Sequence, residues 1–435
     1  MRRARTAGRR PLRVLVFPGG TESGLEIWRS LRWLPRIELF SAGEEVSSHA
    51  PYVFARHFVV PRVDRPGWLR RLNAVLRTQR IDYVFPAHDD VVLALAEHRR
   101  ELRARVVGSP LATCRICRSK RATYRALRAR VPVPQVLGPN DVRRFPVFAK
   151  PDRGQGSQDA HRIDDALQLA ELLRTDPGRY LVTEYLPGSE YTVDCLTDRH
   201  GRLRYAAGRL RARIRNGISV DTYAVERPEF RRYARAINRT LRLRGAWFFQ
   251  LKEDRDGRLR LLEVAPRIAG AMALNRVLGA NLPLLSLYVA AGTDIEVLTN
   301  RTTVRMDRAL TNRFRHDLVV RRAYVDLDDT LVVRGRVHDE LVRLLHQFVG
   351  RGVRLILLTR HAGDPRAVLR HHRLDGLFDE VVHLEPGRPK SAAIRAGPGT
   401  ILIDDSFSER AEVARRRRIP TFDASMLELL GDDRA

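Results

Sequence analysis

The chain has 435 residues, which predicts two or three domains rather than a single core, and its 44% hydrophobic content is ordinary for a globular protein. A net charge of +28 is typical of nucleic-acid-binding proteins. However, only four of the 79 basic residues are lysine, and the arginines are scattered along the chain. We therefore interpret the charge as a solvated background without a specific nucleic-acid partner. No stretch approaches the ~20 continuous apolar residues of a membrane span, and the apolar run at 14–17 is too short for a signal peptide, so we expect a cytoplasmic protein that binds no membrane.

The first part of the chain, residues 1–110, alternates short β-branched runs with helical patterns. This alternation predicts a parallel sheet with crossover helices, an α/β arrangement. Expected strands lie at 13–17, 37–42, 57–61, 83–87 and 105–109, and expected helices at 24–34, 67–79 and 90–104.

Two loops in this part follow a strand and open a helix. The loop at 18–24 contains three glycines and either holds an anion at the helix N-terminus or is a plain strand-to-helix turn. The loop at 86–90 is a candidate wall of a substrate site.

The middle of the chain, residues 111–300, mixes helices with strand pairs and therefore predicts an α+β domain. Expected strands lie at 145–151, 181–186, 191–196, 203–210, 247–254 and 259–266, and expected helices at 119–129, 164–174, 228–243 and in a tail to 292. Cys114, Cys117 and Cys195 are too few for a disulfide framework and lack further zinc ligands, so we interpret them as ordinary residues.

The last part of the chain follows an arginine-rich connector at 301–322. Strand and helix patterns alternate again over residues 323–435 and predict a small doubly wound α/β domain. Expected strands lie at 323–327, 354–359, 380–384 and 400–405, and expected helices at 338–350, 364–372, 390–395 and 407–416.

A lysine and two glycines at the end of one expected strand suit the phosphates of a nucleotide. Lys150 ends the strand, and Gly154 and Gly156 follow it closely. Lysine supplies a compact charge, and glycines allow backbone N–H groups to approach phosphate oxygens. A glycine-containing hairpin has the same pattern, so this segment alone does not decide between the two interpretations.

Three further motifs follow in order: Leu-Val-Thr-Glu-Tyr-Leu-Pro-Gly-Ser-Glu from residue 181, Phe-Gln-Leu-Lys from 249 and Leu-Glu-Val-Ala-Pro-Arg from 262. Together with the Lys150 segment, this series resembles the ATP-grasp superfamily, especially members related to carbamoyl-phosphate synthetase and D-alanine ligase. The resemblance covers residues from about 12 to 300. It implies a Rossmann-like pre-ATP-grasp domain over 1–110, an ATP-grasp domain over 111–300, and ATP with Mg²⁺ as cofactors.

The resemblance also implies a role for each matching residue. The lysines would reach the phosphates, residues 154–157 would close over them, residues 184–186 would bind the adenine edge, and Glu190 would bind the ribose. The implied nucleotide-binding residues are Lys120, Lys150, Gly154, Gln155, Gly156, Ser157, Glu184, Tyr185, Leu186 and Glu190. Gln250 and Glu263 would bind metal, and Arg267 would face the transferred phosphate.

Two positions near the implied metal ligands leave alternatives open. Ala265 occupies the place where many family members have an asparagine that also binds magnesium, so either one metal site is weakened or another oxygen completes the octahedron. Lys252 shares a strand face with Gln250, so it either reaches a phosphate or a substrate carboxylate or is an exposed lysine.

The C-terminal part carries a second ordered series. Asp326 lies near the end of its first expected strand and Asp328 follows it, Thr359 ends the second strand, Lys390 opens a helix, and an acidic pair at 404–405 ends a later strand. This order resembles the haloacid dehalogenase (HAD) superfamily of phosphatases over residues from about 323 to 430. The resemblance implies a HAD-like phosphatase domain at 323–435.

The resemblance to HAD phosphatases assigns the chemistry as follows. Asp326 would attack phosphorus, Asp328 would protonate the leaving oxygen and activate water, and Thr359 and Lys390 would bind the phosphoryl group. The implied magnesium ligands are Asp326, Asp328, Asp404 and Asp405.

The spacing of these motifs leaves no room for a cap domain. Only 33 residues separate Asp326 from Thr359 and 31 separate Thr359 from Lys390, and the expected strands and helices fill both gaps. We therefore expect a capless, open site, and the alternative is a domain retained only as a scaffold.

Together the two resemblances predict an ATP-dependent carboxylate–amine ligase, acting through an acyl phosphate, fused to a magnesium-dependent phosphatase in one small-molecule pathway. The expected partners are a small carboxylate, an amine and a phosphate ester. An ATP-grasp kinase with a reversing phosphatase, and a nucleic-acid-binding protein, are the alternatives. The motifs do not identify the substrates, because substrate pockets are lined by variable loops.

Overall fold

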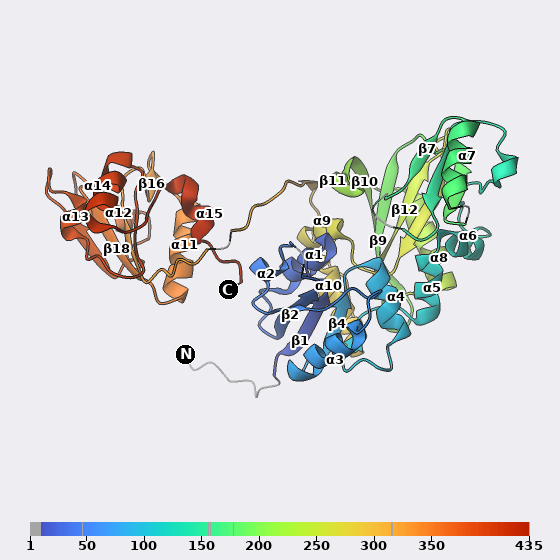
Figure 1. Cartoon of the computed structure of the whole chain (residues 1–435), viewed down its shortest axis with the longest axis horizontal. Helices are drawn as coiled ribbons and strands as arrows, with labels where there is room; N and C mark the ends of the chain where they lie inside the picture. The colour runs from blue at the N-terminus through green and yellow to red at the C-terminus, as the bar shows by residue number, and fades with distance from the viewer. Residues whose placement is uncertain are drawn as a thin grey trace. The chain divides into compact units, whose positions relative to one another are not determined.

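The computed structural model describes residues 10–434 except residues 46, 155, 157, 177 and 315. The chain divides into two compact units, Met1–Leu310 and Thr311–Ala435, here called the N-terminal and C-terminal units (Figure 1). Within the described residues, every helix is too short or too polar to cross a membrane.

The N-terminal unit begins with a parallel sheet of strand order β3-β2-β1-β4-β5. Its elements are β1 (Leu12–Phe17), α1 (Glu22–Leu31), β2 (Ile37–Gly43), α2 (Ala50–Val53), β3 (His57–Val59), α3 (Trp68–Thr78), β4 (Tyr83–Pro86), α4 (Asp89–Glu97) and β5 (Arg105–Val106). Successive residues of β1 point to opposite faces, so that Val14 and Val16 pack with α1, whereas Leu15 and Phe17 pack with α3. This is the parallel sheet with crossover helices that the sequence predicts.

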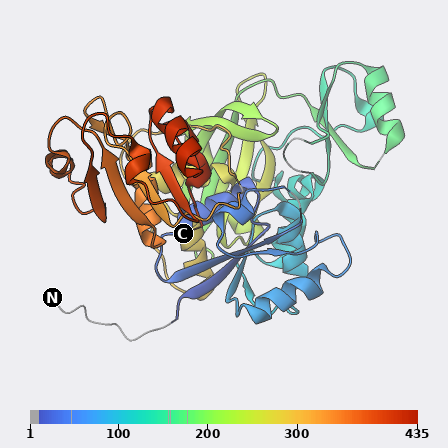
Figure 2. The same cartoon turned by 60° about the vertical axis from the view of Figure 1, so that its left-hand side comes forward.

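Two antiparallel sheets follow, with strand orders β7-β6-β8 and β13-β12-β9-β10-β11-β14. Their strands are β6 (Val147–Pro151), β7 (His161–Ile163), β8 (Tyr180–Glu184), β9 (Glu190–Thr197), β10 (Leu203–Arg215), β11 (Ile218–Ala224), β12 (Gly245–Glu253), β13 (Leu259–Ala265) and β14 (Arg305–Asp307). The accompanying helices are α5 (Leu111–Arg118), α6 (Lys120–Leu127), α7 (Ala166–Thr175), α8 (Pro228–Leu241), α9 (Ala273–Val277) and α10 (Leu282–Ala291). The small sheet and α7 project from the rest of the N-terminal unit in Figures 1 and 2.

Some of these elements were not expected from the sequence, namely α5, β7, β11 and β14. Of these, β14 lies inside the predicted connector and pairs with β11 at the edge of the large sheet. Edge strands with exposed polar side chains lack the apolar period that reveals a buried strand, so the pattern at 305–307 gave no signal.

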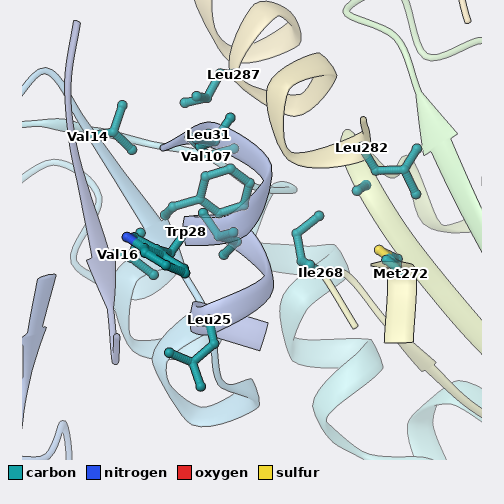
Figure 3. Packing of buried hydrophobic residues seen from close by; sticks show 14 of the residues in the cluster. Val14, Val16, Leu25, Trp28, Leu31, Val107, Ile268, Met272, Leu282 and Leu287 are labelled. Carbon is teal, nitrogen blue, oxygen red and sulfur yellow. The ribbon is translucent and has the colours of Figure 1, made fainter. Parts of the chain in front are cut away.

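One core joins the parallel sheet to the segment that follows β13. Val16 of β1 and Trp28 of α1 belong to the same buried cluster as Ile268, Met272 and Leu282 (Figure 3). The shared core fixes the end of β13 against the loops that follow β1 and β4, although these segments are far apart in the sequence.

The C-terminal unit is a parallel sheet of order β19-β18-β15-β20-β21 with helices on both faces. Its elements are β15 (Arg322–Val325), β16 (Val332–Val333), β17 (Arg336–Val337), α11 (Asp339–Gly350), β18 (Arg354–Thr359), α12 (Pro365–His371), β19 (Glu380–His383), α13 (Lys390–Ala393), β20 (Thr400–Ile403), α14 (Phe407–Arg417), β21 (Thr421–Phe422) and α15 (Leu427–Leu430). Ala323 and Val325 pack with α11, α12 and α15, whereas Tyr324 packs with α13 and α14. Residues 326–390, all of which are described, form only the elements named here and contain no additional domain.

Candidate functional site

One face of the large sheet carries a row of polar residues from four neighbouring strands. Glu263 of β13 pairs in register with Gln250 of β12, Gln250 with Thr192 of β9, and Thr192 with Arg209 of β10. Directly paired residues on adjacent strands point to the same face with Cβ atoms roughly 5 Å apart. The implied metal ligands Gln250 and Glu263 therefore lie side by side.

The first cleft lies between the small sheet and the large sheet. It is lined by ten of the residues to which the sequence assigns nucleotide or metal roles: Lys120, Lys150, Gly154, Gly156, Glu184, Tyr185, Leu186, Glu190, Gln250 and Glu263. Its remaining lining residues are Pro134, Phe148, Pro151, Gln158, Ala160, Thr183, Arg211, Gly217, Lys252 and Leu262. Gln155 and Ser157 lie outside the described residues, and Arg267 lines an adjoining cleft.

Lys150 is buried at the base of the first cleft. Its Nζ donates to the hydroxyl of Tyr124 at 2.8 Å, and that hydroxyl donates to the carbonyl of Leu262 at 2.9 Å. Burial lowers the pKa of Lys150 to about 7, and Lys120 adds to the lowering while Glu263 and Glu190 oppose it. An anion bound in the cleft would raise this pKa again, because negative charge favours the protonated amine, and the resulting ammonium group would stabilise the anion.

Lys120 links the start of α6 to the segment that contains Gly154 and Gly156, here called the glycine segment. Its Nζ donates to the carbonyls of Pro151 at 3.2 Å and Gly154 at 3.3 Å. The carboxylate of Asp152 accepts from Ser119 Oγ at 2.8 Å and from the backbone N–H of Arg121 at 2.7 Å. These bonds hold both lysines on the same side of the cleft.

The glycine segment also touches the turn between β10 and β11. Gly217 has a φ of 73°, and a Cβ at that position would lie 2.2 Å from the carbonyl oxygen of Gly156. Only glycine permits both this backbone conformation and this approach. The turn and the glycine segment therefore close one end of the first cleft together.

Two acidic residues that line the first cleft are held by specific partners. The side chain of Glu184 accepts from the backbone N–H of Gln135 at 2.8 Å, so its carboxylate fixes the neighbouring chain. Glu190 forms an ion pair with Arg211 and lies 3.7 Å from Lys252 Nζ. Lys252 thus contacts an acid of the first cleft, and whether it also reaches a phosphate or a substrate carboxylate stays open.

The second cleft adjoins the first and shares five lining residues with it: Gly156, Arg211, Gly217, Gln250 and Glu263. It is lined by Thr21, Glu22, Ser23, Ala87, His88, Gly156, Thr192, Arg209, Arg211, Gly217, Ile218, Ser219, Phe248, Gln250, Glu263, Arg267, Ala269, Gly270, Ala271 and Arg308. Both loops that the sequence indicated, 18–24 and 86–90, contribute to this wall.

Arg267 is fixed in the second cleft by a residue that sequence reasoning did not single out as its partner. Its Nε and Nη2 each donate to a carboxylate oxygen of Asp89 at 2.7 Å, and its Nη1 donates to Ser23 Oγ at 3.2 Å. Burial opposes ionisation of Asp89, but the guanidinium of Arg267 holds the pKa of that carboxyl below its usual value. A bidentate pair of this kind sets the orientation of the arginine.

Ala265 is buried in the core cluster below the site and offers no side-chain oxygen. Gln250 and Glu263 are thus the oxygen-bearing side chains that the register places together at the boundary of the two clefts. An amide and a carboxylate oxygen are ligands that Mg²⁺ accepts, so this donor set fits that ion.

The C-terminal unit has its own cluster, at the carboxyl ends of β15 and β20. Asp326, Asp404 and Asp405 each offer an oxygen, and these oxygens lie within 4.8 Å of one another. Lys390 Nζ donates to Asp326 Oδ1 and Asp404 Oδ2, both at 2.6 Å. Burial raises the pKa of Asp326 to about 6, although Lys390 acts in the opposite direction. Three carboxylates so close together suit a divalent cation.

The carboxylate of Asp328 lies outside this cluster, against a residue that the sequence did not indicate. Nδ1 of His361 is 2.9 Å from Asp328 Oδ1, and the backbone N–H of His361 donates to Thr359 Oγ1 at 3.0 Å. Of the four acids assigned to magnesium, Asp328 is therefore the one whose carboxylate is turned away from the others. The hydroxyl of Thr330 donates to Asp405 Oδ1 at 3.1 Å, another contact that sequence reasoning missed.

Comparison with known proteins identifies part of the N-terminal unit. The model of a family described as "ATP-grasp in the biosynthetic pathway with Ter operon" matches residues 176–311. The chain therefore contains an ATP-grasp domain. The matched segment ends at residue 311, so the phosphatase interpretation of the C-terminal unit stays a prediction.

Solved ATP-grasp enzymes share the fold. Biotin carboxylase from Campylobacter jejuni, in a βγ-ATP complex, has a TM-score of 0.55 at 14% identity and covers 65% of this chain and 71% of its own. L-amino acid ligase from Bacillus licheniformis has a TM-score of 0.54 at 17% identity, covering 65% and 75%. N5-carboxyaminoimidazole synthetase from Staphylococcus aureus, complexed with ADP, has a TM-score of 0.54 at 13% identity, covering 67% and 80%. At such identities the likeness concerns the fold alone. The search of curated proteins found no match to this sequence.

Proposed function

We propose that the N-terminal unit is an ATP-dependent carboxylate–amine ligase and that the C-terminal unit is a magnesium-dependent phosphatase. One observation carries the ligase proposal. Gln250 and Glu263 lie side by side at the boundary of two clefts, with Lys150 in the first and Arg267 in the second. This arrangement suits a phosphoryl donor on one side of a metal and an acceptor on the other.

In the first cleft, Lys120 and Lys150 would bind the triphosphate and Glu190 the ribose hydroxyls. Because the carboxylate of Glu184 is bonded to Gln135, binding of the adenine edge falls to the backbone of residues 184–186. The glycine segment and the turn at Gly217 would close over the phosphates.

Magnesium fits the pair Gln250 and Glu263, and when bound it supplies charge stabilisation for phosphoryl transfer. The surrounding cations, Lys150 and Arg267, position the reacting groups and stabilise negative charge that develops on the transferred phosphate.

In the proposed reaction, a carboxylate oxygen of the acid attacks the γ-phosphorus and the bond to the ADP oxygen breaks, which gives an acyl phosphate and ADP. The amine nitrogen then attacks the acyl carbon, loses a proton, and displaces inorganic phosphate. The protein contributes orientation and charge rather than a covalent nucleophile.

An assay across amino acids and small acids, read by ADP production and mass spectrometry, tests the ligase proposal. Lys150→Ala and Glu263→Gln should each abolish ADP formation in a protein that stays folded. ADP formed at the same rate without any amine, together with a stable phosphorylated acid, would favour the kinase alternative instead.

For the C-terminal unit, the proposal rests on Lys390 bridging Asp326 and Asp404 beside Asp405. An oxygen of Asp326 would attack the ester phosphorus while Asp328 protonates the departing alcohol oxygen. Water would then attack the aspartyl phosphate, give its proton to Asp328 and regenerate Asp326. Magnesium fits the three clustered carboxylates and would neutralise charge on the phosphate.

Asp326→Asn removes this nucleophile with little change of shape, so it should eliminate phosphate release from an aryl phosphate while amine-dependent ADP formation continues. Wild-type protein that is inert toward a broad panel of phosphate esters would favour the scaffold alternative.

A further inference from the structure

The second cleft collects buried polar atoms that have no partner. Five buried side-chain nitrogen or oxygen atoms among the described residues lack a hydrogen bond, and three of them belong to residues that line this cleft: Thr192 Oγ1, Arg209 Nη1 and Arg308 Nη1. Native proteins leave few such groups, and each is commonly satisfied by a ligand, an ion or water. Thr192, Arg209 and Arg308 come from three separate segments and line the same cleft, which indicates a binding subsite.

Arg209 is held rigidly with one nitrogen to spare. Only 3% of the residue is exposed. Its Nε donates to Asp194 Oδ2 at 2.8 Å and its Nη2 to Asp194 Oδ1 at 3.4 Å. The same carboxylate accepts from Asn275 Nδ2 at 2.7 Å. The salt bridge therefore fixes the guanidinium while Nη1 keeps its hydrogens unused.

Arg308 approaches the same cleft from the edge of the sheet. It follows β14, and its backbone N–H donates to the carbonyl of Val220 at 2.8 Å. Its Nη2 pairs with Glu22 at the start of α1, which leaves Nη1 unpartnered. The side chain thus joins the edge strand to the first loop of the N-terminal unit, with part of its guanidinium unused.

The arginines of the second cleft are the candidate hydrogen-bond donors for an anion. The lining of this cleft includes four arginines, at 209, 211, 267 and 308, against two acids, Glu22 and Glu263. Each of the four arginines pairs with a carboxylate: Arg209 with Asp194, Arg211 with Glu190, Arg267 with Asp89 and Arg308 with Glu22. Arg209 and Arg308 differ from the other two arginines because each also has a buried Nη1 without a hydrogen-bond partner.

The register sets the distance of this subsite from the reacting end. Thr192 and Arg209 continue the row that starts at Glu263 and Gln250. Two strand spacings, about 10 Å in total, separate the backbones of Gln250 and Arg209. A small acid with one carboxylate at the metal pair and a second charged group a few bonds away spans this interval.

We propose that the acid substrate is dianionic, with its second anionic group, a carboxylate or a phosphate, bound by Arg209, Arg308 and the hydroxyl of Thr192. This inference rests on the proposed ligase function and specifies the substrate class of the same site. If the second anionic group is a phosphate, the acid substrate and the amide product are phosphate esters, and the C-terminal unit would hydrolyse one of them.

Binding of probe acids to the full-length protein in the presence of MgADP tests the proposal by thermal shift and calorimetry. Succinate and glutarate represent the dicarboxylate arm, 3-phosphoglycerate the phosphate arm, and butyrate a monoanion of similar length. At least one dianionic probe should raise the melting temperature at concentrations where butyrate does not, and the arm that responds identifies the second group.

Variants connect the effect to the subsite. Two variants, Arg308→Gln and Thr192→Val, each remove an unpartnered group and leave the salt bridge between Arg209 and Asp194 intact. Arg308→Gln should weaken dianion binding about tenfold or more. Arg305→Gln is the matched control, because Arg305 lies on β14, pairs with Asp221 and does not line the cleft. Its affinity for the same probe should stay within about twofold of the wild type.

Equal binding of butyrate and the dianions, no binding of any dianion, or unchanged affinity in Arg308→Gln would overturn the inference. ADP measurements separate its failure from that of the ligase proposal. Dianion binding that depends on Arg308 but never supports ADP formation with any amine would remove the ligase proposal and leave the subsite standing. ADP formation that depends on an amine and on an acid, but occurs with monoanionic acids alone, would remove the dianion inference and leave the ligase proposal standing.

Discussion

Burial of Lys150 should make nucleotide binding depend on pH. Without nucleotide, burial lowers the pKa of its side chain to about 7. A bound triphosphate restores the protonated form, because negative charge next to a lysine raises its pKa. Binding above pH 7 therefore takes up a proton, and affinity is greatest below pH 7 and falls as pH rises.

The size of the effect follows from linkage. If the bound state has the ordinary lysine pKa of about 10.4, apparent affinity falls about fivefold between pH 7 and 8, about ninefold between pH 8 and 9, and about sevenfold between pH 9 and 10. Proton uptake is about one half at pH 7 and about nine tenths at pH 8. For folding without nucleotide the sign is opposite, since the unfolded chain holds this proton between pH 7 and 10 and stability should rise across that window.

Calorimetry of a non-hydrolysable MgATP analogue in two buffers of different ionisation enthalpy measures the uptake directly. Lys150→Met is the matched control, because it keeps an unbranched side chain of similar length without a titratable group. The reasoning fails if the wild type takes up no proton at pH 8, or if the variant takes up the same fraction as the wild type.

Three further changes have defined outcomes. Arg267→Lys loses the bidentate pair with Asp89 and should lower kcat for ADP formation about hundredfold; a change under threefold in steady-state kinetics would show that this arginine does not face the reaction. Asn275→Ala removes one hydrogen bond to the Asp194 carboxylate and the acceptor of the Tyr205 hydroxyl, so it should lower the free energy of unfolding of the N-terminal unit in urea by about 1–3 kcal/mol. Asn140→Ala, at an exposed position, is the control and should leave that free energy almost unchanged. His361→Gln removes the imidazole that lies against Asp328 and should lower phosphate release about tenfold, while a change under twofold in a folded variant would argue that His361 does not position Asp328.

The sequence predicted the parts of the site that are local in the chain. Lys150 with its glycines, and Gln250 and Glu263 on neighbouring strands, occupy short motifs, and the structure brings these residues to one cleft. The parallel sheets were predictable for a similar reason, because buried strands carry a continuous apolar pattern that crossover helices interrupt.

What the sequence did not predict depends on distant pairing. Asp89 meets Arg267 from 178 positions away, and Arg308 meets Glu22 from 286 positions away, so no local pattern reveals either pair. Arg209 and Arg308 are two among 79 basic residues, and only the fold distinguishes them from the solvated arginines. The same applies to His361, whose relation to Asp328 depends on the adjacency of β15 and β18.

The most direct test of the ligase proposal uses an acid labelled with ¹⁸O in its carboxylate, chosen as one that supports ADP formation. The full-length Asp326→Asn protein is used so that the C-terminal unit releases no phosphate of its own. If an acyl phosphate forms and the amine displaces phosphate, mass spectrometry should find one ¹⁸O atom in each inorganic phosphate released, together with an equal amount of the amide. Unlabelled phosphate released with ADP, and no amide, would contradict the proposal.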